Sequence, residues 1–338
     1  QMCIRDRIRP SKSLQDSIDK MLAGNREFIM LDEQKVVYEE ILRAARQSAT
    51  DCKKRVIIVQ GGPGSGKSVG AVNLLAQLTK EDQVCQYVSK NSAPRNVYEK
   101  KLKGSLRKSS IENLFSGSGS FTEAKENMLD TILADEAHRL NAKSGMFHNL
   151  GENQIKEIIH AAKCSVFFLD ESQRVTLQDI GSVDEIKKWA MLENAEVKEM
   201  ELTSQFRCNG SDGYLAWLDH TLEIRETANP DMKEIDYDIR IVESPFEMKH
   251  LIIERNRSSR NRARILAGYC WNWLKEGVNN PAVHDIKIGD FEMSWNLKNT
   301  TTFAIDEDSI NEAGCIHTSQ GLEFDYVGVI IGDDMRYE

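Results

Sequence analysis

The 338-residue chain lacks long apolar runs, and none approaches the roughly 18 apolar residues that a membrane-spanning helix requires. This absence predicts a soluble protein without a membrane partner. Cysteine is sparse as well: the seven cysteines form no C-x-x-C pair, so the sequence indicates neither a zinc knuckle nor a disulfide framework. We therefore expect a reducing compartment, the cytoplasm.

Positive charge is in shorter supply than negative charge, with 44 Lys and Arg against 53 Asp and Glu and a formal net charge of −9. This balance disfavours a surface coated with phosphate-binding side chains, although an acidic molecule can still carry a local basic groove. The composition is otherwise that of a globular protein, with 40% hydrophobic and 29% charged residues. At this length, two domains are the expected number.

Both ends of the chain differ from ordinary protein termini. Residues 2–7 (Met-Cys-Ile-Arg-Asp-Arg) match the translation of a transposon-end sequencing adapter, which predicts an assembly artefact; a genuine amino terminus is the alternative. The final pair, Tyr337-Glu338, lies just past an apolar strand with no closing helix. This pattern predicts a fragment of a longer protein.

Strand-length apolar runs alternate with longer helical patterns, an order typical of βαβ units in a parallel sheet. The predicted strands are Val56–Gln60, Val84–Val88, Thr131–Ala134, Val166–Leu169 and, near the end, Tyr326–Ile331. Polar loops follow these strands, and ligands bind outside the carboxyl ends of strands in open α/β sheets. We therefore predict an α/β fold with its chemistry at that edge of the sheet.

Residues 61–68 fit the phosphate-loop pattern G-x-x-x-x-G-K-[ST] between a predicted strand and an amphipathic helix. Such a loop turns backbone N–H groups toward phosphates, and the helix amino terminus adds a favourable dipole. Lys67 would place its charge on the β- and γ-phosphate oxygens, and Ser68 would offer its hydroxyl to Mg²⁺. The predicted ATP-binding residues are Gly61, Gly62, Pro63, Gly64, Ser65, Gly66, Lys67 and Ser68; a plain glycine-rich turn is the alternative.

Two adjacent carboxylates, Asp135 and Glu136, come directly after the third predicted strand. Asp135 would hold Mg²⁺ through water, and Glu136, pointing to the other side, would polarise the attacking water as general base. A solvated acidic strand end is the alternative. The phosphate loop upstream favours the metal site.

Further motifs occur in the order expected for superfamily 1 helicases. They are Leu31–Gln34 (a Q motif), Ser89–Arg95 (a nucleic-acid contact loop), Leu169–Gln173, Leu202–Arg207 and Cys315–Asp325 (motif V). The region from about residue 28 to residue 338 resembles the Schlafen group 3-like DNA/RNA helicase domain of prokaryotic proteins. The resemblance implies two RecA-like P-loop domains with parallel sheets, the second incomplete. A guanine-binding Asn-Lys-x-Asp motif, which a switch GTPase would need, is absent from the sequence.

The resemblance also implies roles for single residues. Gln34 would read the adenine edge, Gln173 would sense the γ-phosphate, and Arg207 would be an arginine finger. Gly321 and Glu323 would couple the second domain to nucleotide and nucleic acid. The implied nucleic-acid contacts are Lys90, Asn91, Arg95, His317 and Thr318. For the Q-motif glutamine, the contact loop, Gln173 and Arg207, an ordinary surface or helix position is the alternative.

Two glycine- and serine-rich stretches, Phe115–Ser120 and Asn209–Gly213, predict flexible segments, and the second predicts the domain boundary. We expect an amino-terminal segment over residues 1–27, an ATP-binding domain over 28–208 and a second domain over 209–338. The second catalytic arginine of helicases would lie past residue 338, so the isolated fragment is expected to lack a complete ATPase site.

Basic clusters and tryptophans in the chain leave two interpretations open. The clusters are Lys100, Lys101, Lys103, Arg107 and Lys108, and Arg255, Arg257, Arg260, Arg262 and Arg264. Each cluster would contact phosphates or, as is more usual, form a solvated face. Trp271 and Trp273 would stack on bases or, as we favour, fill core space.

The leading hypothesis is an ATP-dependent helicase or translocase that uses Mg²⁺ and moves along single-stranded DNA or RNA. A second is an ATP-gated nucleic-acid-binding switch that controls an attached nuclease or defence domain without unwinding. A third is an ATPase that acts on a protein partner.

Overall fold

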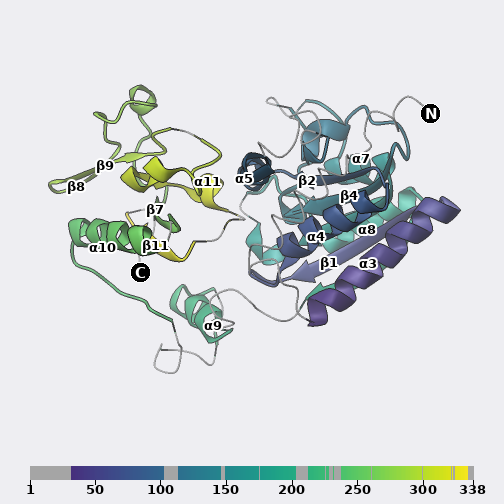
Figure 1. The fold of residues 1–338 in the computed structure, drawn as a ribbon, viewed down its shortest axis with the longest axis horizontal. Coiled ribbons are helices and arrows are strands. Elements are labelled where there is room, and N and C mark those ends of the chain that lie inside the picture. Colours follow the sequence, from purple (N-terminus) through teal and green to yellow (C-terminus); the bar gives the residue numbers. More distant parts are fainter. Residues whose placement is uncertain are drawn as a thin grey trace. The chain divides into compact units, whose positions relative to one another are not determined.

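The protein is described by a computed structural model that covers residues 32–102, 113–145, 149–174, 176–202, 212–224, 226–227, 231, 237–259, 261–298, 300–320, 322 and 324–333. Within it the chain divides into two compact units (Figure 1). The first comprises Gln1–Lys90 and Leu102–Asp238, and the second comprises Asn91–Lys101 and Ile239–Glu338. The boundary expected between residues 208 and 209 lies outside the described residues.

The first unit contains a six-stranded parallel sheet in the order β3-β2-β4-β5-β1-β6. Its strands are β1 (Arg55–Gly61), β2 (Cys85–Ser89), β3 (Phe115–Gly117), β4 (Leu129–Asp135), β5 (Ala162–Leu169) and β6 (Glu196–Leu202). The four strands predicted for this region correspond to β1, β2, β4 and β5, so the predicted α/β fold with a parallel sheet is confirmed. Strand β5 lies between the phosphate-loop strand β1 and the acidic strand β4.

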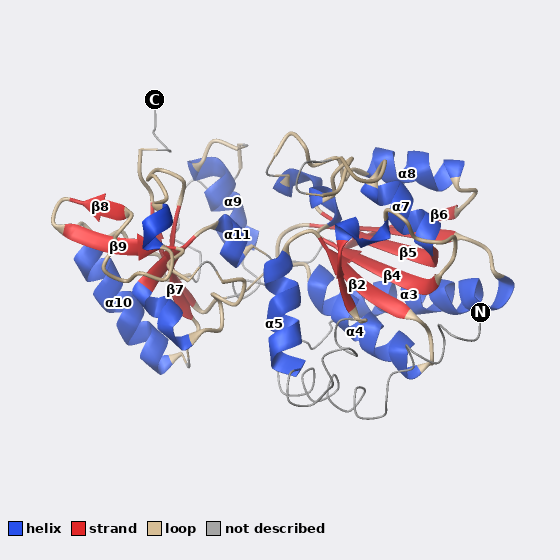
Figure 2. Cartoon of the chain, turned by 90° about the horizontal axis from the view of Figure 1, so that it is seen from above, coloured by secondary structure: helices blue, strands red, loops and turns tan. Residues whose placement is uncertain are grey.

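Helices cover both faces of this sheet (Figure 2). Helices α3 (Asp32–Asp51) and α4 (Lys67–Lys80) pack on one face, and α7 (Gln154–Ala161) and α8 (Val183–Leu192) pack on the other. Helices α7 and α8 each begin at a polar N-cap residue. The Asn153 side chain accepts hydrogen bonds from two backbone N–H groups of α7, and the Ser182 side chain accepts one from the backbone N–H of Glu185 in α8. Helix α9 (Asp212–Thr221) follows later in the chain. No helix in the described ranges is long and apolar enough to cross a membrane.

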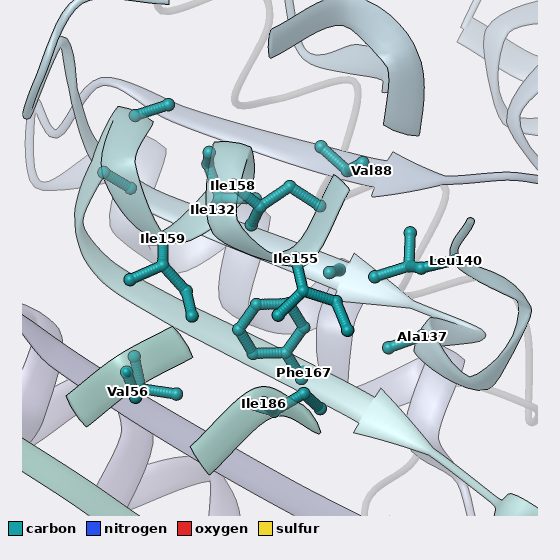
Figure 3. Packing of buried hydrophobic residues seen from close by; sticks show 14 of the residues in the cluster. Val56, Val88, Ile132, Ala137, Leu140, Ile155, Ile158, Ile159, Phe167 and Ile186 are labelled. Carbon is teal, nitrogen blue, oxygen red and sulfur yellow. The ribbon is translucent and has the colours of Figure 1, made fainter. Parts of the chain in front are cut away.

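One hydrophobic core of the first unit lies between the sheet and helices α7 and α8 (Figure 3). Phe167 of β5 is fully buried among Ile155, Ile158 and Ile186. Burying each such side chain contributes about 1.5–3 kcal/mol. The strands that carry the polar loops are therefore held on a rigid support.

The segment Phe115–Ser120, predicted to be flexible, is ordered instead. It forms β3 and the 3₁₀ helix η2 (Ser118–Phe121). Phe115 and Phe121 are buried at either end, and the Phe115 ring lies 5.7 Å from the Tyr87 ring. These aromatic anchors outweigh the conformational freedom of the glycines between them.

The second unit contains a five-stranded sheet in the order β11-β7-β10-β9-β8. Its strands are β7 (Ala263–Ala267), β8 (Ile286–Ile288), β9 (Phe291–Trp295), β10 (Glu312–Gly314) and β11 (Tyr326–Ile330). All pairs are parallel except the hairpin β8–β9. Helix α10 (Pro245–Ser258) packs on β7 and β11. Strand β11 corresponds to the strand predicted near the end of the chain.

Arg264 does not belong to a solvated basic face, as its cluster predicted. Its guanidinium is fully buried and donates to the carbonyls of Phe303 (3.0 Å), Ala304 (2.9 Å) and Asp306 (2.9 Å). Burial lowers the pKa of Arg264 to about 10. The arginine thus holds the turn before the 3₁₀ helix η7 (Glu307–Asn311) against β7.

Trp271 and Trp273 were both expected to fill core space, but only Trp271 packs against the core. Trp271 is partly buried against the core of the second unit, but Trp273 is 44% exposed. The buried tryptophan of this sheet is Trp295, at the end of β9. Trp273 lies in an irregular segment before the 3₁₀ helix η6 (Lys275–Gly277), where no sheet or helix face orients it inward.

The fold predicts a large difference between two leucines of the first unit. Leu133 is fully buried in β4, whereas Leu177 is fully exposed. Leu133→Ala is expected to lower the free energy of unfolding by about 2–5 kcal/mol, because it removes buried methyl groups and leaves a cavity. Leu177→Ala should change it by less than about 0.5 kcal/mol. Urea denaturation of both variants checks this; equal midpoints would contradict the assigned core.

Candidate nucleotide-binding site

The phosphate loop connects β1 to α4, and its last glycine is required by geometry. Gly66 precedes α4 with a φ of 89°, a left-handed conformation that favours glycine. A Cβ atom at this position would lie 1.9 Å from Nε2 of Gln34. Within the loop, the Ser65 hydroxyl donates to the Gly62 carbonyl (3.0 Å). The loop is therefore a tightly closed turn rather than an open linker.

Lys67, the first residue of α4, places its ammonium group inside this turn. Nζ donates to the carbonyls of Gly61 (2.5 Å) and Gly62 (2.8 Å), and the residue is buried. A buried ammonium group next to the amino end of a helix is suited to binding anions. The structure thus places Lys67 at the phosphate loop, and its contact with the β- and γ-phosphate oxygens stays a prediction.

Gln34, on α3, contacts the phosphate loop directly. Its Nε2 donates to the Ser65 carbonyl (2.9 Å), and the side chain is buried. This contact spans 31 residues of sequence and ties the first turn of α3 to the loop. The structure therefore shows Gln34 supporting the loop, and the adenine contact expected for it stays a prediction.

Asp135, at the end of β4, is the most deeply buried acid near the loop, with 1% of its surface exposed. The Tyr87 hydroxyl donates to Oδ2 (2.6 Å), and the backbone N–H of Glu136 donates to Oδ1 (3.0 Å). Burial raises the pKa of the Asp135 carboxyl and the charge of Glu136 raises it further. Hydrogen bonds from Ser68 and Tyr87 and the charge of Lys67 act in the opposite direction.

The hydrogen bond between Ser68 and Asp135 places two hard oxygen ligands side by side, as a Mg²⁺ site needs. Nowhere in the described ranges, this position included, is there a group of three or more His, Cys, Asp and Glu side chains that could hold a metal ion. Mg²⁺ usually takes one or two protein ligands and completes its shell with water and phosphate oxygens. The residues at this position therefore fit a magnesium nucleotide.

Tyr87 is a site residue that the sequence reasoning missed. It lies on β2, and its hydroxyl reaches across to the end of β4 because these strands are neighbours in register. The pattern of β2 shows only a buried strand, so no local signal distinguishes this tyrosine from a core aromatic.

Glu136 has a non-glycine left-handed backbone, with φ 52° and ψ 40°, where β4 turns into the 3₁₀ helix η3 (Ala137–Arg139). Such a conformation costs on the order of 1–3 kcal/mol and is common at functional sites. The Glu136 side chain is mostly buried, and its Oε2 lies 3.2 Å from Nε2 of His138. The turn directs the two neighbouring carboxylates into different surroundings.

The motif after β5 is organised by the Asp170 carboxylate. Oδ1 accepts hydrogen bonds from the backbone N–H (3.1 Å) and hydroxyl (2.6 Å) of Ser172, and Oδ2 accepts one from Nε2 of Gln173 (2.8 Å). These contacts cap the 3₁₀ helix η4 (Glu171–Gln173). Gln173 is thus fixed to its own motif, and γ-phosphate sensing stays a prediction.

Lys90, expected to contact nucleic acid, lies in a network of charges. Its Nζ donates to Asn141 Oδ1 (2.8 Å) and Asp179 Oδ1 (3.0 Å), and Arg139 Nε lies 2.9 Å from Asp179 Oδ2. The Asp179 side chain is completely buried. Much of the Lys90 charge is therefore compensated within the protein, and a phosphate would compete with Asp179 for it.

The remaining nucleic-acid candidates lie in the second unit. Asn91 donates to the Gln320 carbonyl (3.1 Å) ahead of helix α5 (Ser92–Leu102), which carries Arg95. In the short helix α11 (Ile316–Ser319), the Thr318 hydroxyl accepts from Cys315 N (3.0 Å), and the His317 ring lies 6.1 Å from the ring of Tyr269. Arg207, Gly321 and Glu323 lie outside the described residues.

Asp179→Asn should destabilise the first unit strongly, because it removes the buried anion that faces Arg139 and Lys90. Breaking such a buried pair costs about 3–5 kcal/mol. Glu199→Gln, which breaks the exposed ion pair of Glu199 with Lys187 (2.7 Å), should cost less than about 1 kcal/mol. Denaturant titrations of both variants decide the matter, and similar losses would show that the Asp179 network is unimportant.

Comparison with known proteins gives matches of different strength. The model of the Schlafen group 3 DNA/RNA helicase domain matches residues 54–338. The uncharacterized protein YPL245W of Saccharomyces cerevisiae is 24% identical over 348 residues, covering 90% of this chain and 75% of that protein.

Solved structures are similar only remotely. The structure of a DNA replication initiation factor shares 15% sequence identity with this chain. The match covers 70% of this chain and 64% of the chain of that factor, with a TM-score of 0.31. AMPPCP-bound DnaA from Aquifex aeolicus shares 17% identity over 70% of this chain and 71% of its own, with a TM-score of 0.31. The structure of PCH-2 of C. elegans shares 16% sequence identity with this chain. The match covers 75% of this chain and 65% of the PCH-2 chain, with a TM-score of 0.28. These TM-scores are too low to support an argument, and this chain spans less than two thirds of the first and third of these structures. The family model, by contrast, matches most of the chain, which therefore belongs to the Schlafen group 3 DNA/RNA helicase domain family.

Proposed function

We propose that the chain is part of an ATP-dependent DNA or RNA helicase or translocase that couples ATP hydrolysis to movement along a single strand. The observation that carries the proposal is the meeting of Lys67, Ser68 and Asp135 at the carboxyl edge of one parallel sheet, with Glu136 adjacent. Membership in a helicase-domain family supports the nucleic-acid part.

In this proposal the glycine loop and Lys67 bind the β- and γ-phosphates of ATP. Ser68 and Asp135 would hold Mg²⁺, which when bound neutralises phosphate charge and orients the phosphates. Tyr87 keeps the Asp135 carboxylate in place through its 2.6 Å hydrogen bond. Gln34 maintains the shape of the loop from behind Gly66.

Hydrolysis needs a base for the attacking water, and Glu136 is the proposed base. As the water oxygen bonds to the γ-phosphorus, its proton passes to the Glu136 carboxylate and the bond to the β–γ bridging oxygen breaks. ADP and inorganic phosphate are the products. By resemblance to the family, Arg207 would stabilise the charge on the transferred phosphoryl group, Gln173 would sense it, and Gly321 and Glu323 would couple it to the strand.

The larger organisation is part of the same proposal. We propose that residues 28–208 and 209–338 correspond to two RecA-like domains that change their separation during the ATP cycle, and that the cytoplasmic protein carries further domains, such as a nuclease or defence module. The parallel strands β7, β10, β9 and β11 support a nucleotide-motor type of sheet in the second unit. Lys90, Asn91, Arg95, His317 and Thr318 would contact the strand.

ATP turnover by the full-length protein is expected to rise when single-stranded DNA or RNA is added. Glu136→Gln should lower kcat by about 10²–10⁴-fold, because it removes the base. Lys67→Ala should lower turnover by about 10²-fold or more, whereas Lys53→Ala, at an exposed lysine of the same unit, should not. Colorimetric phosphate release measures all four proteins. Turnover that no strand stimulates would instead indicate an ATPase acting on a protein partner.

Nucleotide binding can be separated from turnover by thermal unfolding. At a concentration about 100 times its Kd, Mg²⁺ with a non-hydrolysable ATP analogue should stabilise the protein by about 2.7 kcal/mol. Chelation of Mg²⁺ should reduce this gain, and Lys67→Ala should remove it. Undiminished stabilisation of Lys67→Ala would place the nucleotide elsewhere. Stabilisation without turnover would favour the ATP-gated switch.

A further inference from the structure

Tyr269, in the second unit, is oriented in an unusual way for a surface tyrosine. A tyrosine normally packs its ring against the protein and keeps its hydroxyl in water. Here the hydroxyl donates to Sγ of the buried Cys315 (3.5 Å), and burial raises the pKa of Tyr269. The residue is nevertheless 58% exposed. The exposed surface is therefore largely that of the ring.

Contacts at both ends of the side chain hold the Tyr269 ring in place. The ring lies 5.0 Å from that of Trp295, with 71° between the planes, and 6.1 Å from that of His317. Trp295 is 1% exposed, so it forms a fixed support at the end of β9. The Sγ atom that binds the tyrosine hydroxyl also receives the Thr318 hydroxyl (3.9 Å). Because the side chain is already ordered, stacking of a ligand on its ring costs little further conformational entropy.

The position of Tyr269 in the sheet is one where open α/β sheets bind ligands. Tyr269 comes two residues after the carboxyl end of β7, and Cys315 comes directly after that of β10, the neighbouring strand. The chain leaves β7 toward β8 on one side, and it leaves β10 toward β11 on the other side of β7. Adjacent strands whose connections run in opposite directions form a topological switch point, and ligands bind outside their carboxyl ends.

The surroundings of the ring suit a flat aromatic ligand that is attached to an anionic backbone. The two segments that follow these strands, residues 268–273 and 315–320, contain no aspartate or glutamate that would repel phosphates. His317, beside the ring, is exposed as well. Every nucleobase has a flat π-face, so an aromatic side chain can bind a strand without reading its sequence.

We propose that the exposed ring of Tyr269 is a stacking platform for one nucleobase of the bound single strand. The inference rests on the proposed function, because it names how the second unit holds the strand along which the motor moves. His317 and Thr318 are nucleic-acid contacts that the family resemblance implies, and both are connected to Tyr269. Tyr269 adds a contact that is made to a base and carries no charge.

Binding of a fluorescently labelled single-stranded oligonucleotide to the full-length protein, followed by anisotropy, tests the platform with DNA and with RNA. Tyr269→Ala should raise the Kd by about 5- to 100-fold, the usual effect of removing one stacked aromatic. Tyr269→Leu keeps an apolar contact with Trp295 but has no ring, and it should bind as weakly. Tyr269→Phe keeps the ring and loses only the hydroxyl, so its Kd should stay within about threefold of that of the wild type.

Tyr326→Ala is the matched control. Tyr326 is also an exposed tyrosine of this sheet, but it is the first residue of β11 and so lies at the opposite, amino-terminal edge. Its substitution should leave the Kd unchanged. Melting temperatures show beforehand that each variant is folded.

Two further measurements show whether the lost contact is made to a base. On an oligonucleotide that has abasic sites throughout, Tyr269→Ala and the wild type should bind equally. The slope of log Kd against log salt concentration should be the same for both proteins on the normal strand, because Tyr269 neutralises no phosphate. An equally large loss on the abasic strand, or a reduced salt slope, would contradict base stacking.

The remaining outcomes separate this inference from the proposed function. Wild-type affinity in Tyr269→Ala and Tyr269→Leu, with ATP turnover that the strand still stimulates, would overturn the inference and leave the proposed function standing. A weaker affinity for ATP alone, with strand affinity unchanged, would assign the ring to adenine and would overturn it as well. If the wild-type protein binds no strand, the proposed function fails and the platform fails with it.

Discussion

Burying a carboxylate at the end of a parallel sheet is unfavourable unless donors and positive charge compensate it, and the first unit is arranged around such a group. Asp135 receives hydrogen bonds from the Tyr87 hydroxyl, from Ser68 and from the backbone of Glu136, with the Lys67 charge nearby. These donors come from β2, from α4 and from the turn after β4. The donors and the positive charge that make this burial tolerable therefore lie where a magnesium nucleotide would need them.

Local pattern was sufficient to predict much of this arrangement. The glycines of the phosphate loop, the buried strands and the acidic pair each have a signature within about ten residues, and the carboxyl ends of parallel strands converge by topology. Partners that lie far apart in sequence had no such signature. Tyr87 on β2 reaches Asp135 on the adjacent strand β4, Gln34 binds the Ser65 carbonyl, and Asp179 compensates Lys90; in each case the strand order or loop packing decides the contact.

The second unit was harder to predict, and for identifiable reasons. Its strands β8 and β10 have three residues each, too few for a periodic pattern, and the antiparallel hairpin departs from βαβ order. Arg264 appeared solvated because its neighbours are basic, although carbonyls from a turn some 40 residues away accept its hydrogen bonds. The roles of Arg207, Gly321 and Glu323 depend on residues outside the described part of the chain, and a RecA-like second domain stays a prediction.

If phosphate and metal meet at the Asp135 edge of the sheet, a crystal structure with Mg²⁺ and a transition-state analogue such as ADP with aluminium fluoride should show both there. We expect Lys67 Nζ to leave the Gly61 and Gly62 carbonyls for phosphate oxygens, and the ion to lie beside Ser68 and Asp135 with Glu136 facing the attacking water. A nucleotide bound elsewhere, or an analogue that leaves Lys67 on the two carbonyls, would contradict it.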